Sequence, residues 1–167
     1  MWYVILFFVT LFLDQITKIV CDAFNVDILV IEDIFSIEIA YNRGASFSFL
    51  SGKEWAQTFF IILTVVVLLV GVLFVIWKKP KHKWLNSALT LMFSGTIGNF
   101  IDRIAFGYVR DFINVHFFAN FNVADSCLCV GAFMLIFYVL FLDSDPVFNV
   151  GKKRIEKHGE EAEKKDE

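Results

Sequence analysis

Long apolar stretches separated by short polar segments dominate residues 1–142. A helix that crosses a bilayer needs about 20 mostly apolar residues, because the hydrocarbon core is about 30 Å thick. Four windows have this length, at residues 2–20, 55–77, 84–103 and 123–142. Asp14 and Lys18 interrupt the first window and Asp125 lies near the start of the fourth, whereas the second carries no charge. The pattern predicts an all-α membrane protein with a bundle of four transmembrane helices.

The segment between the first two windows has a different period. Apolar residues alternate with polar or small ones from Phe35 to Asn42 and again over residues 45–49, with Gly44 between the two runs. A period of two places successive side chains on opposite faces of a strand, and glycine adopts the backbone angles that turns need. We expect a small extracytoplasmic β element over residues 25–54, resting at the membrane surface between helices one and two.

Basic residues set the expected orientation. Residues 78–83 contain four Lys residues, whereas residues 21–54 contain six acids and two bases. Short loops rich in Lys and Arg stay in the cytoplasm. This rule places the 78–83 turn and both termini in the cytoplasm, and the segments 21–54 and 104–122 outside.

Composition separates a membrane domain from a charged tail. Of all residues 57% are hydrophobic and 20% are charged, against about 45–50% and about 25% in soluble domains. Residues 143–167 hold 14 of the 33 charged side chains, so we expect a membrane domain over 1–142 and a disordered cytoplasmic tail. These values exclude a coiled coil, a secreted disulfide scaffold and an ordinary soluble enzyme. The net charge of −3 argues against nucleic acid as a partner.

The polar residues of the apolar windows share one depth. Asp14 and Lys18 lie near the outer end of the first helix, Asn99 and Asp102 near the outer end of the third, and Asp125 at the outer start of the fourth. Charged groups in a membrane are costly and mark function by default. Their convergence in the outer leaflet predicts a functional site there.

Each of these residues also has a purely structural interpretation. Asp14 and Lys18 are four residues apart, so they could form an ion pair that only neutralises both charges. Asp102 and Arg103 could anchor the third helix at the headgroups. Asn122 could cap the fourth helix. These alternatives remain open for single residues, but they do not explain why the residues converge.

Among the possible chemistries, paired carboxylates fit best. No HExxH motif or paired metal-ligand spacing occurs, so we expect neither a metal site nor a cofactor. Ser46, Ser48 and Lys53 lie on the outer side, but no sequence signature supports a Ser/Lys pair. Asp111 and Asp125 are both on the outer side, although Asp111 alone could be a solvated loop acid. Two close carboxylates in a poorly solvated site share a proton, and such a pair can activate water.

Five motifs carry a resemblance to a known family. They are LDQITK at 13–18, NRGASF at 42–47, GNFIDR at 98–103, GYVRDFI at 107–113 and FNVADS at 121–126. In this order, and over about residues 10–142, the chain resembles lipoprotein signal peptidase, also called signal peptidase II. The stretch from Asp111 to Asp125 is shorter than in many members, which bears on the size of the outer loop.

The resemblance implies an intramembrane aspartic protease of the bacterial cytoplasmic (inner) membrane. Such enzymes remove signal peptides from prolipoproteins by cutting before a Cys that carries a diacylglyceryl group. The family's catalytic pair falls on Asp111 and Asp125. Its remaining active-site positions fall on Asp14, Lys18, Asn42, Gly44, Asn99, Asp102, Arg103, Asn122 and Ala124. The expected partners are lipid-modified prolipoproteins and membrane lipid, and we expect a monomer.

Two other functions remain as alternatives at this point. A small proton- or cation-coupled transporter could use Asp14 as its carrier site, although transporters place such groups near the midplane. A non-catalytic lipoprotein-binding or assembly factor would bind the precursor but would not depend on the two aspartates.

Overall fold

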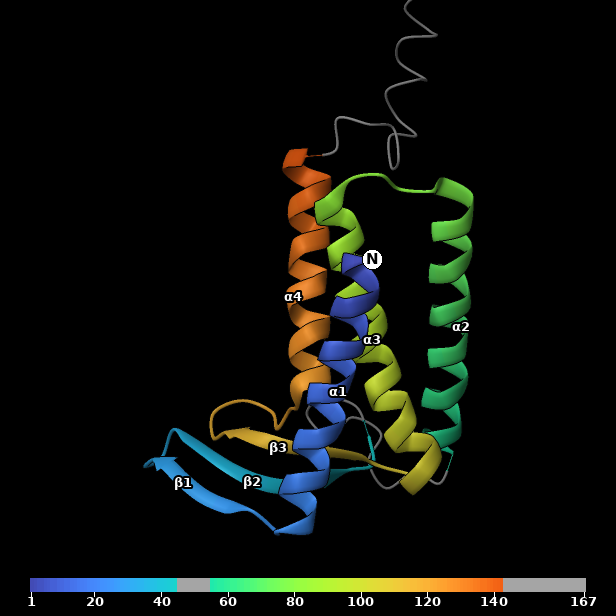
Figure 1. Ribbon diagram of the computed structural model, residues 1–167. Coiled ribbons are helices and arrows are strands. Elements are labelled where there is room, and N and C mark those ends of the chain that lie inside the picture. Colours follow the sequence, from blue (N-terminus) through green and yellow to red (C-terminus); the bar gives the residue numbers. More distant parts are fainter. Residues whose placement is uncertain (45–54, 143–167) are drawn as a thin grey trace, which may run out of the picture.

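The computed structural model describes residues 1–44 and 55–142, and four long helices form most of it (Figure 1). Their bounds are Trp2–Ala23 (α1), Ala56–Lys78 (α2), Lys83–Phe106 (α3) and Val123–Phe137 (α4), and a short π-helical segment, Tyr138–Leu142, continues α4. The four predicted helices are therefore present, and α1 and α3 each end three residues later than expected. The predicted tail over 143–167 lies outside the described residues.

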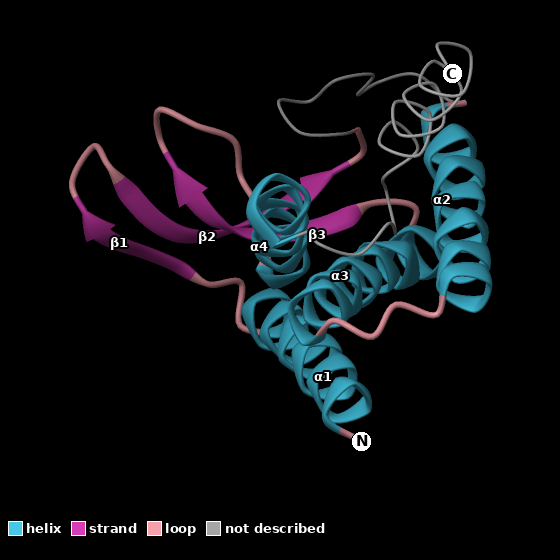
Figure 2. Ribbon diagram, turned by 90° about the horizontal axis from the view of Figure 1, so that it is seen from above, coloured by secondary structure: helices cyan, strands magenta, loops and turns pink. Residues whose placement is uncertain are grey.

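Three of these helices are long and apolar enough to cross a membrane, namely α1, α2 and Val123–Leu142. The expectation of four such helices is confirmed for these three. Helix α3 has the length but not the composition, because amides, hydroxyls and glycines interrupt its apolar residues. Its position explains this composition, since α3 packs against α1, α2 and α4 and lies between them (Figure 2).

Glycines let α3 and α4 approach closely. A Cβ at Gly95 would collide with the carbonyl oxygen of Ala124, and one at Gly131 would lie 2.8 Å from the carbonyl oxygen of Ala88. Small residues at such contacts favour tight helix packing in membranes, where van der Waals contact replaces the hydrophobic effect. The Gly95 contact fixes the start of α4 against the middle of α3.

A three-stranded antiparallel sheet lies at one end of the helices (Figure 1). Its order is β1 (Asp27–Ile31), β2 (Phe35–Asn42) and β3 (Val109–Val115). Strands β1 and β2 confirm the predicted β element in part, while its second alternation at 45–49 lies outside the described residues. Strand β3 was not predicted, because the adjacent charges of Arg110 and Asp111 interrupt its apolar pattern.

The sheet is tied to the helices through short connections. Gly107 ends α3 with a φ of 74°, a left-handed conformation that glycine adopts without strain. The chain then forms β3, which pairs with β2, and after β3 it leads to the start of α4. Register places Asp111 opposite Ala40, beside an irregularity between Ile37 and Ala40. The polar ends of the helices therefore meet β3 at one place.

Candidate active site

Asp111 of β3 and Asp125 of α4 line the same cavity, of about 190 Å³. The Asp111 carboxylate accepts hydrogen bonds from Asn42 Nδ2 at 3.0 Å and from Asn122 Nδ2 at 2.7 Å. The Asp125 carboxylate accepts from Asn99 Nδ2 at 2.8 Å and from the backbone N–H of Asn122 at 3.2 Å. The two acids that the sequence singled out are thus held side by side by three asparagines.

Asn122 joins the two carboxylates because it also caps α4. Its Oδ1 accepts from the backbone N–H of Asp125 at 2.9 Å, and the Asp125 side chain accepts in return, which completes a capping box. The Nδ2 of the same amide is left to donate to Asp111. The capping interpretation of Asn122 is therefore correct, and the cap itself builds the site.

Asn42 is oriented in the same way by a neighbour. Its Oδ1 accepts from the backbone N–H of Gly44 at 2.9 Å, so its Nδ2 faces Asp111. Burial and the nearby Asp125 charge raise the pKa of Asp111 from 3.8 to about 7, although the hydrogen bonds from Asn42 and Asn122 act to lower it. Asp111 therefore titrates near neutral pH, as one member of a close carboxylate pair does.

Asp14 and Lys18 connect α1 to this site. Their side chains form an ion pair at 3.0 Å and are buried, so the proposed mutual neutralisation does occur. Asp14 Oδ1 also accepts from the backbone N–H of Ala124 at 2.8 Å, and Lys18 Nζ donates to Asn99 Oδ1 at 2.9 Å. With these partners Asp14 is a structural anchor for α4, which argues against a carrier site.

Arg103 lines the cavity but does not reach either aspartate through a hydrogen bond. Its Nη2 donates to the Gly44 carbonyl at 3.3 Å and its Nη1 to the Asn99 carbonyl at 3.5 Å. Its guanidinium lies over the ring of Phe60 at 5.2 Å. Within the described part of the chain its buried Nε has no hydrogen-bond partner. Arg103 thus lines the cavity through a guanidinium that is held by two backbone carbonyl groups.

Sequence reasoning missed Arg110, a charged residue that contacts the predicted site residue Asp102. Asp102 is fully buried, and its carboxylate accepts hydrogen bonds from Arg110 Nη2 at 2.8 Å and from Arg110 Nε at 3.2 Å. Arg110 also lies 3.7 Å from Asp22 of α1. Arg110 follows Asp102 by eight residues and lies beyond the turn at Gly107, so no periodicity links the two. Arg110 and Asp111 are adjacent in a strand, so their side chains lie on opposite faces of the sheet. This alternation is the signal that could have placed Arg110 on a second buried face, away from Asp111.

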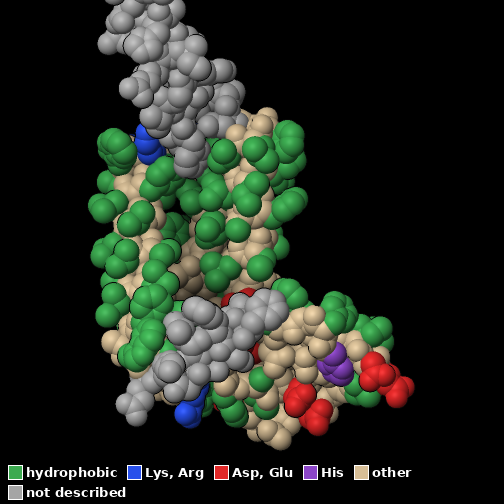
Figure 3. Space-filling model, turned by 180° about the vertical axis from the view of Figure 1, so that it is seen from behind, with side chains coloured by type: hydrophobic (Ala, Val, Ile, Leu, Met, Phe, Trp, Pro, Cys, Tyr) green, Lys and Arg blue, Asp and Glu red, His purple; other side chains and the backbone are tan. Residues whose placement is uncertain are grey.

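The cavity is bordered by residues of α2, α3, α4 and the sheet. Its polar wall contains both aspartates, and its other lining residues include Thr64, Thr96 and Leu128. Figure 3 shows acidic side chains at the foot of a hollow between two columns of apolar helix surface. Over 1–44 and 55–142, no group of three or more His, Cys, Asp or Glu residues is arranged to hold a metal ion.

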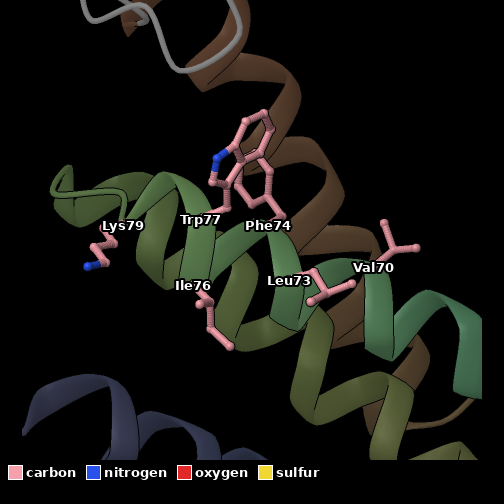
Figure 4. Close-up of a pocket in the computed structure, with 6 residues that line it drawn as sticks. All are labelled: Val70, Leu73, Phe74, Ile76, Trp77 and Lys79. Atoms are coloured by element: carbon pink, nitrogen blue, oxygen red, sulfur yellow. The ribbon is translucent and has the colours of Figure 1, made fainter.

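A second pocket lies at the opposite end of α2 and is apolar in character. Phe74 and Trp77 extend from one side of the helix, and Ile76 and Lys79 from another (Figure 4). It has no acid and no amide in its lining, so it lacks the groups that hydrolysis needs.

Comparisons with known proteins agree on one family. The model of the family described as signal peptidase (SPase) II matches residues 6–141. The chain is 44% identical over 137 residues to the lipoprotein signal peptidase of Pseudomonas putida, covering 75% of this chain and 78% of the relative. It is 45% identical over 114 residues to that of Streptococcus thermophilus, covering 67% and 72%.

The fold resembles that of a solved bacterial membrane enzyme. The TM-score is 0.77 at 33% sequence identity, and the match covers 85% of this chain and 89% of the other. A second solved bacterial membrane enzyme matches with a TM-score of 0.72 over 85% and 94% of the two chains.

Proposed function

This chain belongs to the signal peptidase II family, and we propose that Asp111 and Asp125 are the catalytic pair with which it cleaves prolipoproteins. It is an aspartic protease that removes signal peptides. The observation that carries the proposal is the shared cavity in which Asn122 contacts both carboxylates. As the family resemblance implies, the cut falls before a Cys that carries a diacylglyceryl group.

The two carboxyl groups have different roles in this proposal. Asp111, with a pKa of about 7, keeps a proton at neutral pH and donates it to the scissile carbonyl oxygen. Asp125 lies in the first turn of α4, where the helix dipole stabilises a carboxylate, and it accepts a proton from the attacking water. The water oxygen bonds to the carbonyl carbon and gives a gem-diol. The C–N bond then breaks, the amine leaves with the proton taken up by Asp125, and one hydroxyl of the gem-diol returns its proton to Asp111 as the new carboxyl group forms.

The remaining site residues support this pair. Asn42, Asn99 and Asn122 hold the carboxylates through their side-chain amides. Asp14, Lys18, Asp102, Gly44 and Ala124 hold the asparagines and the start of α4 in place, directly or through backbone groups. A buried carboxylate without such partners is costly. Arg103, whose guanidinium lines the cavity, is suited to bind a carbonyl group of the substrate peptide.

The apolar surface of the sheet supports a site at the outer leaflet. Asp111 and Ile113 share one face of β3 because they are two residues apart. Register places Ile37 of β2 opposite Ile113, and Ile28 of β1 opposite Ile37. This apolar face, on the side of Asp111, rests on the bilayer in our proposal. Helix α3 is then the fourth span, and the Lys-rich turn after α2 and both termini are cytoplasmic.

The substrate enters sideways beside α2. Helix α2 packs against α3, and α2, α3 and α4 all border the cavity. The signal peptide would lie in the bilayer along the hollow seen in Figure 3, while its diacylglyceryl group stays in the outer leaflet. Anchoring in the same leaflet as the carboxylates reduces the entropic cost of placing the peptide bond between them. The enzyme needs no second subunit for this arrangement, so we propose a monomer.

A cleavage assay tests the catalytic pair. Purified Asp111→Asn and Asp125→Asn, each inserted in liposomes, should lose cleavage of a diacylglyceryl-modified precursor by at least about a thousandfold, since the amide neither activates water nor completes the pair. Asp27→Asn, at an exposed acid of β1, is the matched control and should cleave at the wild-type rate. EDTA should leave the wild-type rate unchanged. Cleavage by either pair variant at the control's rate would refute the assignment.

A further inference from the structure

Arg110 is the buried charge that the proposed reaction does not use. It precedes Asp111 in β3, so its side chain leaves the opposite face of the strand. Only 3% of its surface is exposed, and its guanidinium lies 4.6 Å from the centre of the Phe106 ring. Its nearest acid is Asp102, which takes hydrogen bonds from the backbone N–H, Nε and Nη2 of Arg110. Arg110 therefore satisfies Asp102 almost completely.

A second cation lies within reach of the same carboxylate. Lys18 Nζ is 3.6 Å from Asp102 Oδ2, but only 3.0 Å from Asp14 and 2.9 Å from Asn99 Oδ1. In a buried site an acid that lacks its partner is strongly unfavourable. If Arg110 were absent, Asp102 would therefore attract the Lys18 ammonium away from Asn99.

The position of that ammonium determines which way the Asn99 amide points. Asn99 Oδ1 accepts from Lys18 Nζ at 2.9 Å and from Asn122 Nδ2 at 3.1 Å. Because both neighbours are donors, the Nδ2 end must face Asp125, to which it donates at 2.8 Å. Without Lys18 only Asn122 would hold the oxygen end of the Asn99 amide, so the amide would be less firmly fixed and its hydrogen bond to Asp125 would weaken.

We propose that Arg110 is a positioning residue for peptide cleavage: by holding Asp102 it keeps Lys18 on Asn99, so that Asn99 donates to Asp125. The inference rests on the proposed catalytic role of Asp125. Arg110 acts through three side chains and from the far face of β3, so it affects turnover rather than substrate binding. Its effect depends on its charge opposite Asp102.

Charge removal and charge rescue test this assignment. Arg110→Met keeps an apolar side chain against Phe106 but leaves Asp102 unpaired. Its kcat should fall about tenfold to a hundredfold, the size expected for a misplaced catalytic group, with KM within about twofold of wild type. Arg110→Met combined with Asp102→Asn removes both charges and should recover most of the lost kcat. Arg110→Lys, which keeps the charge, should also retain most of it.

Controls separate this inference from its premise. Asp22→Asn removes only the outer partner of Arg110, at 3.7 Å, and should keep the wild-type kcat. Wild-type kcat in Arg110→Met, or a double variant no faster than Arg110→Met, overturns the role of Arg110. If Arg110→Met does not accumulate, Arg110→Gln with and without Asp102→Asn gives the same comparison. Asp125→Asn is measured in the same series, and if it cleaves normally the proposed function fails instead.

Discussion

The end of the helix bundle that carries the sheet and the opposite end are built on different principles. At the sheet end, Asp14, Lys18 and Asp102 are buried within a network of ion pairs and amides. At the opposite end of α2, Leu73, Ile76 and Trp77 are exposed around an apolar pocket. Lipid solvates apolar side chains without further structure, whereas a buried charge needs partners from several elements. The polar network therefore lies where the sheet meets the helices, and α2 contributes few polar groups to it.

Substitution at the bridge between the two carboxylates should have the largest effect on this contrast. Asn122→Ala removes the α4 cap and the donor to Asp111 together. We expect kcat to fall at least about a hundredfold, because the relative position of the two catalytic groups is lost. Loss of the cap should add a destabilisation of about 1 kcal/mol. Cleavage rates and thermal unfolding of the same preparation measure the two effects.

Asn114→Ala is the matched control for that substitution. Asn114 lies in β3, on the opposite face of the sheet from Asp111. Its Nδ2 donates to Glu38 Oε2 at 3.5 Å. Its kcat should stay within about twofold of wild type, as for most changes away from a site. Equal loss in both variants would mean that the sheet tolerates no asparagine replacement, and the special role of Asn122 would be refuted.

The pH profile tests the carboxylate pair at the sheet end. Because the pKa of Asp111 is raised to about 7, the rate should fall as pH rises through that value and Asp111 loses its proton. Between pH 3.8, the ordinary pKa of an Asp, and about 7, Asp111 is protonated in the folded chain and ionised in the unfolded chain. The free energy of unfolding therefore decreases as pH rises across this window. Asn42→Ala removes a hydrogen bond that lowers this pKa and should move the alkaline limb of kcat/KM to higher pH.

Tyr41→Phe is the neighbouring control for the pH experiment. Its hydroxyl donates to Asp22 rather than to the aspartate pair, so the alkaline limb should not move. The limb reports the pair as a whole. A shift of the Asn42→Ala limb to lower pH would contradict the role given to that hydrogen bond.

The same contrast explains what the sequence could predict. Long apolar windows identify helices without tertiary information, and the placement of Asp14 and Lys18 relative to them is enough to predict their depth. Strand β3 was missed because Arg110 and Asp111 interrupt its apolar pattern, and Arg110 was missed because the turn at Gly107 separates it from its partner Asp102. Asn42 lies 69 residues from Asp111, and nothing in either local pattern indicates the pairing. The direction of each asparagine amide likewise depends on neighbours that only the fold brings together.

The end of the bundle away from the sheet should be the least sensitive region, and a matched pair of leucines tests this. Leu73 of α2 is 63% exposed at the apolar pocket, whereas Leu85 of α3 is completely buried at the same end of the bundle. Leu73→Ala should change stability by no more than about 0.5 kcal/mol and leave kcat unchanged. Leu85→Ala should cost about 1–3 kcal/mol, because a packing cavity remains even though lipid removes most of the hydrophobic term.

Unfolding in detergent and precursor cleavage in liposomes measure these two quantities for both variants. A large kcat loss in Leu73→Ala with normal stability would mean that the Lys78 end of α2 contacts the substrate, because neither packing nor the carboxylate pair involves Leu73. This end would then be part of the substrate path, and the division between the two ends of the bundle would be wrong. Unchanged kcat in both leucine variants, with a stability cost only at Leu85, would support a catalytic site confined to the sheet end.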